Sequence, residues 1–159
     1  MGTFKIVDAR PLDIASICAI QAECGLSAWT AEAYRYELAR PDSIILAACS
    51  GSCETLGFIA GRVIPATHGP ASDAEIYNIG VGPAFQGRGI GSMLLRHFIK
   101  KSKERGVDRI WLDVRVRNSG AIKFYSDHGF LAAGRRKAFY TDPVDDAEIM
   151  CLRLQDADI

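Results

Sequence analysis

The feature that most constrains the fold of this 159-residue chain is a glycine-rich turn, Gln86-Gly-Arg-Gly-Ile-Gly-Ser92, between two regular stretches. Residues 74–81, before the turn, are typical of a β-strand. The residues after it place apolar side chains at helical spacing, at Ile90, Leu94 and Phe98. A strand, a glycine loop and a helix therefore follow one another in the middle of the chain.

The glycine loop is suited to binding an anion. Because Gly87, Gly89 and Gly91 carry no Cβ atoms, a phosphate can approach their backbone N–H groups, and the helix start adds partial positive charge. A tight turn with close helix packing is the structural alternative. The sequence has no Gly-Lys-Ser/Thr for a P-loop, and Leu94 stands where a dinucleotide fingerprint needs glycine or alanine. The loop therefore matches neither of these two nucleotide sites.

Composition narrows the choice of partner. With 19 basic and 19 acidic side chains and a formal net charge of +0, we expect no nucleic acid and no membrane surface as partner. The longest apolar run, Ile44–Cys49, is far shorter than the roughly 20 residues that cross a bilayer. The five cysteines form no CxxC pairs and the first residues lack an apolar signal segment. We therefore expect reduced thiols, no metal and a cytoplasmic protein.

The order of elements predicts a single α+β domain over residues 1–159, with one central sheet and helices on both faces. The expected strands are Phe4–Val7, Ser43–Cys49, Leu56–Ile64, Ala74–Val81, Arg109–Val116, Phe130–Phe139 and Ala147–Leu154. The expected helices run from Pro11 to near Gly25, over Thr30–Ala39, over Ile90–Arg105, and from the cap Asn118 to Gly129. Alternation in the fourth strand puts four residues on one face, namely Glu75, Tyr77, Ile79 and Val81.

The pattern Gln86-x-x-Gly89-x-Gly91 resembles the loop through which members of the GCN5-related N-acetyltransferase (GNAT) superfamily bind acetyl-CoA. Further runs are similar to the bacterial ribosomal-protein-alanine N-acetyltransferases within it: Ile76–Pro83, Ile110–Arg115, Asn118–Phe130, Arg135–Tyr140 and Trp29-Thr30. The resemblance covers essentially the whole chain. It implies a GNAT fold, with a mixed, mostly antiparallel sheet of six to seven strands flanked by about four helices.

The resemblance implies acetyl-CoA as co-substrate, with no metal. Its pantetheine arm would pair with the backbone of Ile79, Gly80 and Val81, and the Val81 N–H would stabilise the oxyanion. Asn118 would hold the cofactor from the following helix. The pyrophosphate would lie on the loop residues Gln86, Gly87, Arg88, Gly89, Ile90, Gly91 and Ser92. For Arg88, a solvated loop arginine is an equal alternative.

The same resemblance implies the catalytic groups. Tyr125 would contact the cofactor and be the general acid at its sulfur, whereas in isolation it would be a core tyrosine. The subfamily has a glutamate base where this chain has Asp113, one methylene shorter, so Asp113 would act directly or through a bridging water. Glu75 on the neighbouring strand is the second candidate. A strand-surface carboxylate is the alternative for both.

The acceptor is the least constrained part of the prediction. By the resemblance, Trp29 and Tyr140 are expected to border its groove, with core packing as the alternative for Trp29. The acidic segment 140–148 would attract a basic or polar peptide N-terminus, and an acidic solvated turn is an equal alternative. The leading hypothesis is transfer of acetyl to a protein N-terminal α-amine by direct attack in a ternary complex. The alternatives are a small-molecule amine, a lysine side chain, or a non-catalytic acetyl-CoA-binding or sensing module. We expect a monomer or homodimer, and His68, His97 and His128 are assigned no role.

Overall fold

The computed structural model describes residues 3–26, 28–66 and 71–155. The strands of this part are β1 (Phe4–Asp8), β2 (Ser43–Ser50), β3 (Thr55–Ile64), β4 (Ser72–Val81), β5 (Val107–Arg115), β6 (Leu131–Thr141) and β7 (Val144–Arg153). The α-helices are α1 (Ile14–Glu23), α2 (Ala31–Leu38), α3 (Ile90–Glu104) and α4 (Ser119–Asp127). The predicted order of elements is confirmed, with boundaries that differ by a few residues.

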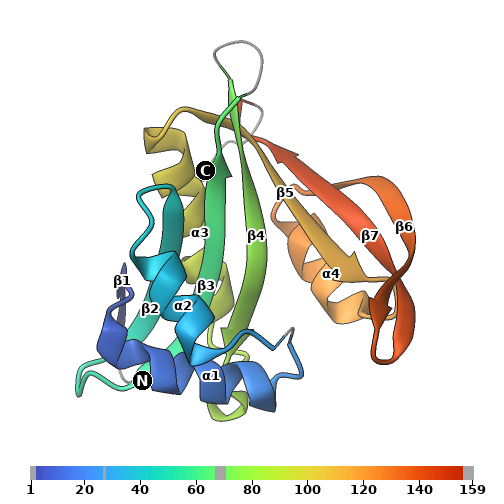
Figure 1. The fold of residues 1–159 in the computed structure, drawn as a ribbon. Helices are drawn as coiled ribbons and strands as arrows, with labels where there is room; N and C mark the ends of the chain where they lie inside the picture. Colours follow the sequence, from blue (N-terminus) through green and yellow to red (C-terminus); the bar gives the residue numbers. More distant parts are fainter. Residues whose placement is uncertain (1–2, 27, 67–70, 156–159) are drawn as a thin grey trace.

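The strands of the described residues form one seven-stranded sheet in the order β1-β2-β3-β4-β5-β7-β6 (Figure 1). Strands β4 and β5 are parallel, and the other neighbouring pairs are antiparallel. The expected mixed, mostly antiparallel sheet is therefore confirmed. The expected cap of α4 is confirmed as well, because the Asn118 Oδ1 accepts the Ala121 N–H at 3.0 Å.

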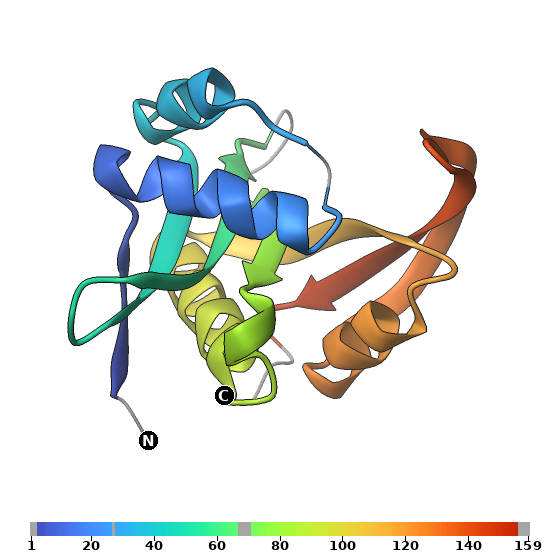
Figure 2. The same ribbon diagram turned by 90° about the horizontal axis from the view of Figure 1, so that it is seen from below.

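The helices cover both faces of the sheet, as predicted. Helices α1 and α2 lie over one face, and α3 and α4 lie over the other (Figure 2). The first layer is packed around Ile17, Tyr34 and Phe58. The second is larger and includes Phe98 of α3 and Tyr125 of α4. The sheet therefore has a buried core on each side.

The predicted alternation along β4 is correct for Glu75 and Tyr77, which share a face, but wrong for Ile79 and Val81. Strand β3 pairs Ala60 with Asn78 and Gly61 with Ile76, so Tyr77 is an extra residue in a β-bulge. Beyond the bulge the side chains exchange faces. Ile79 and Val81 therefore pack with Ala74 and Ile76 on the α3 side. Glu75 and Tyr77 are left on the α1 and α2 side, where the Tyr77 ring contacts Trp29.

The pairing of β4 with β5 stops at Ile76 and Leu112, after which β5, which stays paired with β7, diverges from β4 (Figure 1). In the described part of the chain, no strand adjoins the free side of β4 over residues 77–81. The Gly82 N–H donates to the Leu56 carbonyl of β3 at 2.9 Å. Since these directions alternate along an antiparallel strand, the N–H groups of Val81 and Ile79 point away from β3, into the gap.

We expect substitution of Gly61 to destabilise the protein at the bulge. A Cβ atom there would meet the Glu75 carbonyl oxygen and the ring of Phe98 in α3. Gly61→Ala should lower the free energy of unfolding by about 2 kcal/mol, because neither neighbour can move without repacking the core. Gly51→Ala is the matched control, since a Cβ there meets nothing within 4 Å, and should change stability by less than about 0.5 kcal/mol. Urea denaturation measures both, and equal midpoints would contradict this packing.

Candidate active site

A cavity of about 510 Å³ lies where the end of β4 meets the starts of α3 and α4. Of the residues predicted to bind cofactor, those that line it are Ile79, Gly80, Val81, Gln86, Gly87, Gly89, Ile90, Gly91, Ser92 and Asn118. Gly120, Ala121 and Phe124 of α4 complete the lining near Asn118. The structure thus brings a free strand edge and a helix start into one cavity.

The glycine loop leaves the start of α3 open to this cavity. Gly87 and Gly89 have φ angles of 72° and 79°, a region that L side chains rarely adopt, so glycine is required at both. The Met93 N–H makes a helical bond to the Gly89 carbonyl at 3.1 Å. The preceding N–H groups, of residues 90–92, have no acceptor within the helix and are available to an anion.

Arg88 lies outside this cavity. Its guanidinium donates to the Ala84 carbonyl at 3.0 Å and sits over the Phe85 ring, 5.7 Å from the ring centroid. It lines a neighbouring cavity of about 430 Å³ beside the β2–β3 turn instead. The structure therefore favours the alternative of a loop arginine over a phosphate partner.

Two side chains donate to the Val81 carbonyl, and the sequence predicts this role for neither of them. The Gln86 Nε2 donates to it at 3.0 Å and the Cys24 Sγ at 3.3 Å. Burial raises the pKa of the Cys24 thiol, so this sulfur remains a donor. These two bonds connect the end of β4 to the glycine loop, through Gln86, and to the end of α1, through Cys24.

Tyr125, which is also predicted to contact the cofactor, is not among the residues that line the cavity. It lies in the α3 and α4 layer of the core, next to the cavity-lining Phe124. It is 6% exposed, and its ring packs 5.5 Å from that of Phe130. Burial, followed by the neighbouring Tyr140, raises its pKa, so the phenol stays protonated at neutral pH. Its hydroxyl has no hydrogen-bond partner among the described residues. The Tyr125 hydroxyl is therefore free to donate its proton to a bound substrate.

The two candidate bases have different surroundings. Asp113 of β5 accepts from the Arg136 Nε of β6 at 3.2 Å, and its side chain is 15% exposed. Glu75 is partly buried and has no hydrogen-bond or ion-pair partner in the part of the chain that is described. Burial, and then the negative charge of Asp113, raise the pKa of Glu75. Glu75 is therefore the carboxylate that is better suited to accept a proton near neutral pH.

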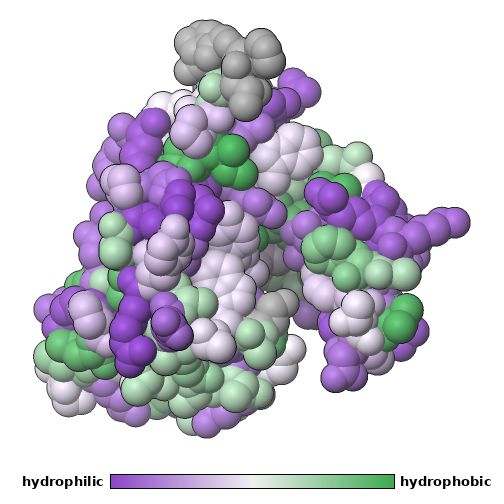
Figure 3. Space-filling view, in the orientation of Figure 1, coloured by the Kyte–Doolittle hydropathy of each residue, from purple (hydrophilic) through white to green (hydrophobic). Residues whose placement is uncertain are grey.

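The predicted acceptor residues lie on the two sides of the gap between β4 and β5. Trp29 is half-buried, with its ring 5.3 Å from that of Tyr77 on β4. Tyr140 is half-buried near the end of β6, under the Arg115 guanidinium at 4.2 Å. Asp113 lies close enough to Tyr140 to raise the pKa of the phenol, after burial as the main cause. The surface is hollowed between the body of the molecule and the β6–β7 hairpin (Figure 3).

The acidic segment 140–148 is less attractive to a basic peptide than expected, because its own chain uses much of the charge. Asp145 pairs with Arg117 at 3.6 Å, and Glu148 pairs with Arg135 at 3.3 Å. The Asp146 Oδ1 accepts the Ala138 N–H at 2.8 Å.

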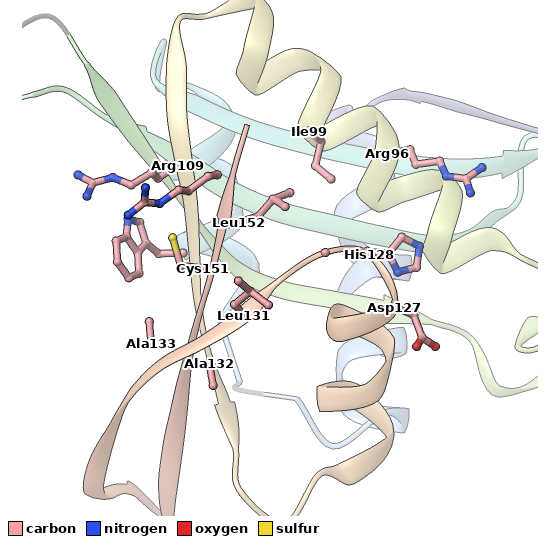
Figure 4. A pocket seen from close by; sticks show the side chains of 13 residues that line it. Arg96, Ile99, Arg109, Asp127, His128, Leu131, Ala132, Ala133, Cys151 and Leu152 are labelled. Carbon is pink, nitrogen blue, oxygen red and sulfur yellow. The ribbon is translucent and has the colours of Figure 1, made fainter. Parts of the chain in front are cut away.

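A larger cavity, of about 840 Å³, lies between α3, the end of α4 and the start of β6 (Figure 4). It contains none of the predicted site residues. Its Arg109 is already bound to Asp73, with the Arg109 Nε and the Asp73 Oδ1 3.0 Å apart. No described residue at the start of a helix lines it, so it offers no helix N-terminal N–H groups to an anion. The smaller cavity is therefore the one that matches the predicted site.

The described residues offer few signs of other kinds of site. Among the described residues, no cluster of His, Cys, Asp or Glu is arranged to hold a metal ion. No helix in the described ranges is long and apolar enough to span a membrane. The rings of His97 and His128 bond to carbonyls of their own helices, and His68 lies outside the described residues.

Comparisons with known proteins identify the family. The profile of the acetyltransferase (GNAT) family matches residues 14–130. The ribosomal protein bS18-alanine N-acetyltransferase of Escherichia coli (strain K12) is 43% identical over 82 residues, 50% of this chain and 55% of that protein. The chain thus spans about half the length of this relative. The N-alpha-acetyltransferase RimI of Mycobacterium tuberculosis is 37% identical over 122 residues, 77% of this chain and 73% of that protein.

The fold agrees with these matches. The crystal structure of the ribosomal-protein-S18-alanine N-acetyltransferase from Escherichia coli has a TM-score of 0.83 at 27% identity, over 96% of this chain and 94% of that one. The expected GNAT fold is confirmed. From its family profile, its fold and the cavity at the glycine loop, the chain belongs to the acetyltransferase (GNAT) family.

Proposed function

We propose that this protein transfers the acetyl group of acetyl-CoA to the α-amine of a protein N-terminus. The observation that carries the proposal is the cavity in which the free edge of β4 meets the open amides of α3. An extended, amide-bearing arm joined to a pyrophosphate needs these two surfaces side by side. No broad positive charge is needed, because backbone amides bind the anion.

The residues present fit this co-substrate. The N–H groups of Ile79 and Val81 point into the gap, where the pantetheine arm would pair with them as an added strand. At Gly91 a Cβ would stand 3.6 Å from the Phe124 ring, a distance that packing tolerates, so the absent side chain mainly keeps the cavity open. The phosphates would lie on the amides of residues 87–92.

The amine needs a base, since an α-amine with a pKa of roughly 8 is mostly protonated at neutral pH. We assign this role to Glu75 in preference to Asp113, the first candidate that the sequence predicts. Glu75 is partly buried and unpaired with a raised pKa, whereas Asp113 is held by Arg136. Asp113 then contributes the negative charge that keeps Glu75 basic.

The reaction follows from these placements. Glu75 takes a proton from the bound ammonium group, and the freed amine attacks the thioester carbon. The Val81 N–H donates to the oxyanion that forms. When the carbon–sulfur bond breaks, the thiolate of CoA takes the proton of the Tyr125 hydroxyl, which burial keeps protonated. As this bond breaks, the second proton on the attacking nitrogen passes to solvent, and the acetylated amine leaves as a neutral amide. Tyr125 then recovers a proton from Glu75 through solvent.

An alanine-initiated protein, in the cytoplasm, is the acceptor we propose, because the Escherichia coli relative is named for acetylating the alanine of ribosomal protein bS18. Turnover of acetyl-CoA should be measured with an alanine-initiated peptide, an N-terminally blocked lysine peptide and a polyamine. The first should give the highest kcat/KM. Highest turnover with either other acceptor would overturn the N-terminal assignment, and tight acetyl-CoA binding without any turnover would indicate a sensing module.

We expect Glu75→Gln to lower kcat/KM about 100-fold at pH 7, because the base is lost. The kcat/KM of the wild-type enzyme should fall only when the pH drops through the raised pKa of Glu75. The variant should instead fall from the amine pKa of about 8 downward, since only free amine reacts with it. Asp113→Asn is the control and should lose less than about tenfold. A larger loss for Asp113→Asn would return the base assignment to Asp113.

Glu75→Gln should also stabilise the folded protein. Because folding raises the pKa of Glu75, its charged form opposes folding above that raised pKa, and this cost vanishes below the ordinary glutamate pKa. Thermal unfolding should therefore show a higher Tm for the variant at pH 8 and a smaller difference at pH 4. A lower Tm at pH 8 would mean that the Glu75 carboxylate has a favourable partner.

Tyr125→Phe should lower kcat while leaving the Kd of acetyl-CoA nearly unchanged. The substitution removes a hydroxyl that is bonded to none of the described residues, so packing against Phe130 persists. We expect a loss of about 100-fold in kcat, the usual value of a general acid. Single-turnover kinetics and calorimetric titration measure the two quantities, and a collapse of affinity with an unchanged rate would make Tyr125 structural.

A further inference from the structure

Gln21 of α1 makes an unusual set of contacts for a residue inside an apolar layer. It is 4% exposed, and its amide pairs with both backbone groups of Trp29. The Nε2 donates to the Trp29 carbonyl at 2.9 Å, and the Oε1 accepts the Trp29 N–H at 3.2 Å. This is the pairing that a neighbouring β-strand would provide. Gln21 therefore fixes the backbone of the α1–α2 connection at Trp29.

The same amide is held in place from two other elements. The Tyr34 hydroxyl of α2 donates to the Gln21 Oε1 at 2.7 Å. The Asn78 Nδ2 of β4 lies 3.5 Å from both the Gln21 Oε1 and the Tyr34 oxygen. Burial raises the pKa of Tyr34 to about 12, so its hydroxyl remains a donor throughout the physiological range. The Gln21 amide is thus held mainly by its two bonds to Trp29, and Tyr34 and Asn78 are additional buried neighbours.

Through Trp29, this cluster reaches the bulge. The Trp29 ring is 5.3 Å from that of Tyr77, the extra residue at the point where β4 and β5 separate. It is also 5.4 Å from the ring of Tyr34. One wall of the gap is therefore formed by Trp29, and Gln21 holds the backbone of that residue.

We propose that Gln21 is a positioning residue for the acceptor: it holds Trp29 against Tyr77 and so sets that wall of the entrance to the β4–β5 gap. The inference rests on the proposed function and on the prediction that Trp29 borders the acceptor groove. Gln21 touches neither substrate. Its effect should therefore appear in the KM of the acceptor, with little change in kcat or in acetyl-CoA affinity.

The test compares Gln21→Met with Tyr34→Phe. Gln21→Met keeps the length of the side chain but removes both bonds to Trp29, and should raise the KM of an alanine-initiated peptide about tenfold. The Kd of acetyl-CoA should stay within about twofold. Tyr34→Phe also removes a buried hydrogen bond but leaves the Gln21 pairing with Trp29, and should change KM by less than about twofold. Equal KM increases would overturn the proposal, because loss of stability would explain both.

A second readout does not depend on turnover. Trp29 and Trp111 are the two tryptophans, so in a Trp111→Phe background the fluorescence reports Trp29 alone. Acrylamide quenching should increase in Gln21→Met and remain unchanged in Tyr34→Phe. Unchanged quenching would overturn the proposal even if no acceptor were acetylated, whereas absence of turnover in the wild type would count against the proposed function only. Increased quenching with an unchanged KM would show that Trp29 does not border the entrance.

Should Gln21→Met lack the wild-type circular dichroism spectrum, Gln21→Glu carries the same tests. A carboxylate keeps an acceptor for the Trp29 N–H and for Tyr34 but has no donor for the Trp29 carbonyl. Gln21→Glu should raise both the KM of the alanine-initiated peptide and the acrylamide quenching of Trp29, as expected for Gln21→Met. Wild-type values of both would overturn the proposal.

Discussion

The loss of pairing between β4 and β5 beyond Ile76 and Leu112 is the constraint on which the candidate site depends. A strand edge inside a sheet leaves backbone donors and acceptors without a partner, which is costly unless a ligand or a side chain satisfies them. Here Gln86 and Cys24 donate to the Val81 carbonyl. The N–H groups of Ile79 and Val81, which point into the gap, are left for a ligand. The bulge at Tyr77 lies at the same point and places Ile79 and Val81 on the α3 side, opposite to Glu75 and Tyr77.

The electrostatics of the gap separate two carboxylates that look alike in the sequence. Arg136 pairs with Asp113, while Glu75 is desolvated, unpaired and exposed to the Asp113 charge. One carboxylate is thereby held in an ion pair, while the pKa of the other is raised. The zero net charge of the chain is consistent with this design, since the phosphates of the co-substrate would meet amides of the glycine loop rather than excess lysine or arginine.

The element order and the ligand loop could be predicted because local rules determine them: glycines with positive φ at 87 and 89, and the cap at Asn118. The bulge could not, because one extra residue changes the face of every later side chain without changing composition. The Arg136 pair depends on register shifts in β6, and the inward turn of Arg88 onto Ala84 depends on loop geometry. Gln21 offered one usable signal, a polar residue on the apolar face of α1, four residues after the buried Ile17.

Hydrogen–deuterium exchange of the β4 amides, with and without acetyl-CoA, tests the central claim most directly. If the pantetheine arm pairs with the free edge, exchange at Ile79 and Val81 should slow by at least about tenfold on binding. The amide of Gly80, which faces β3, should show no comparable change. Protection confined to the larger cavity around Arg96 and Trp111, with none at Ile79 and Val81, would contradict the account.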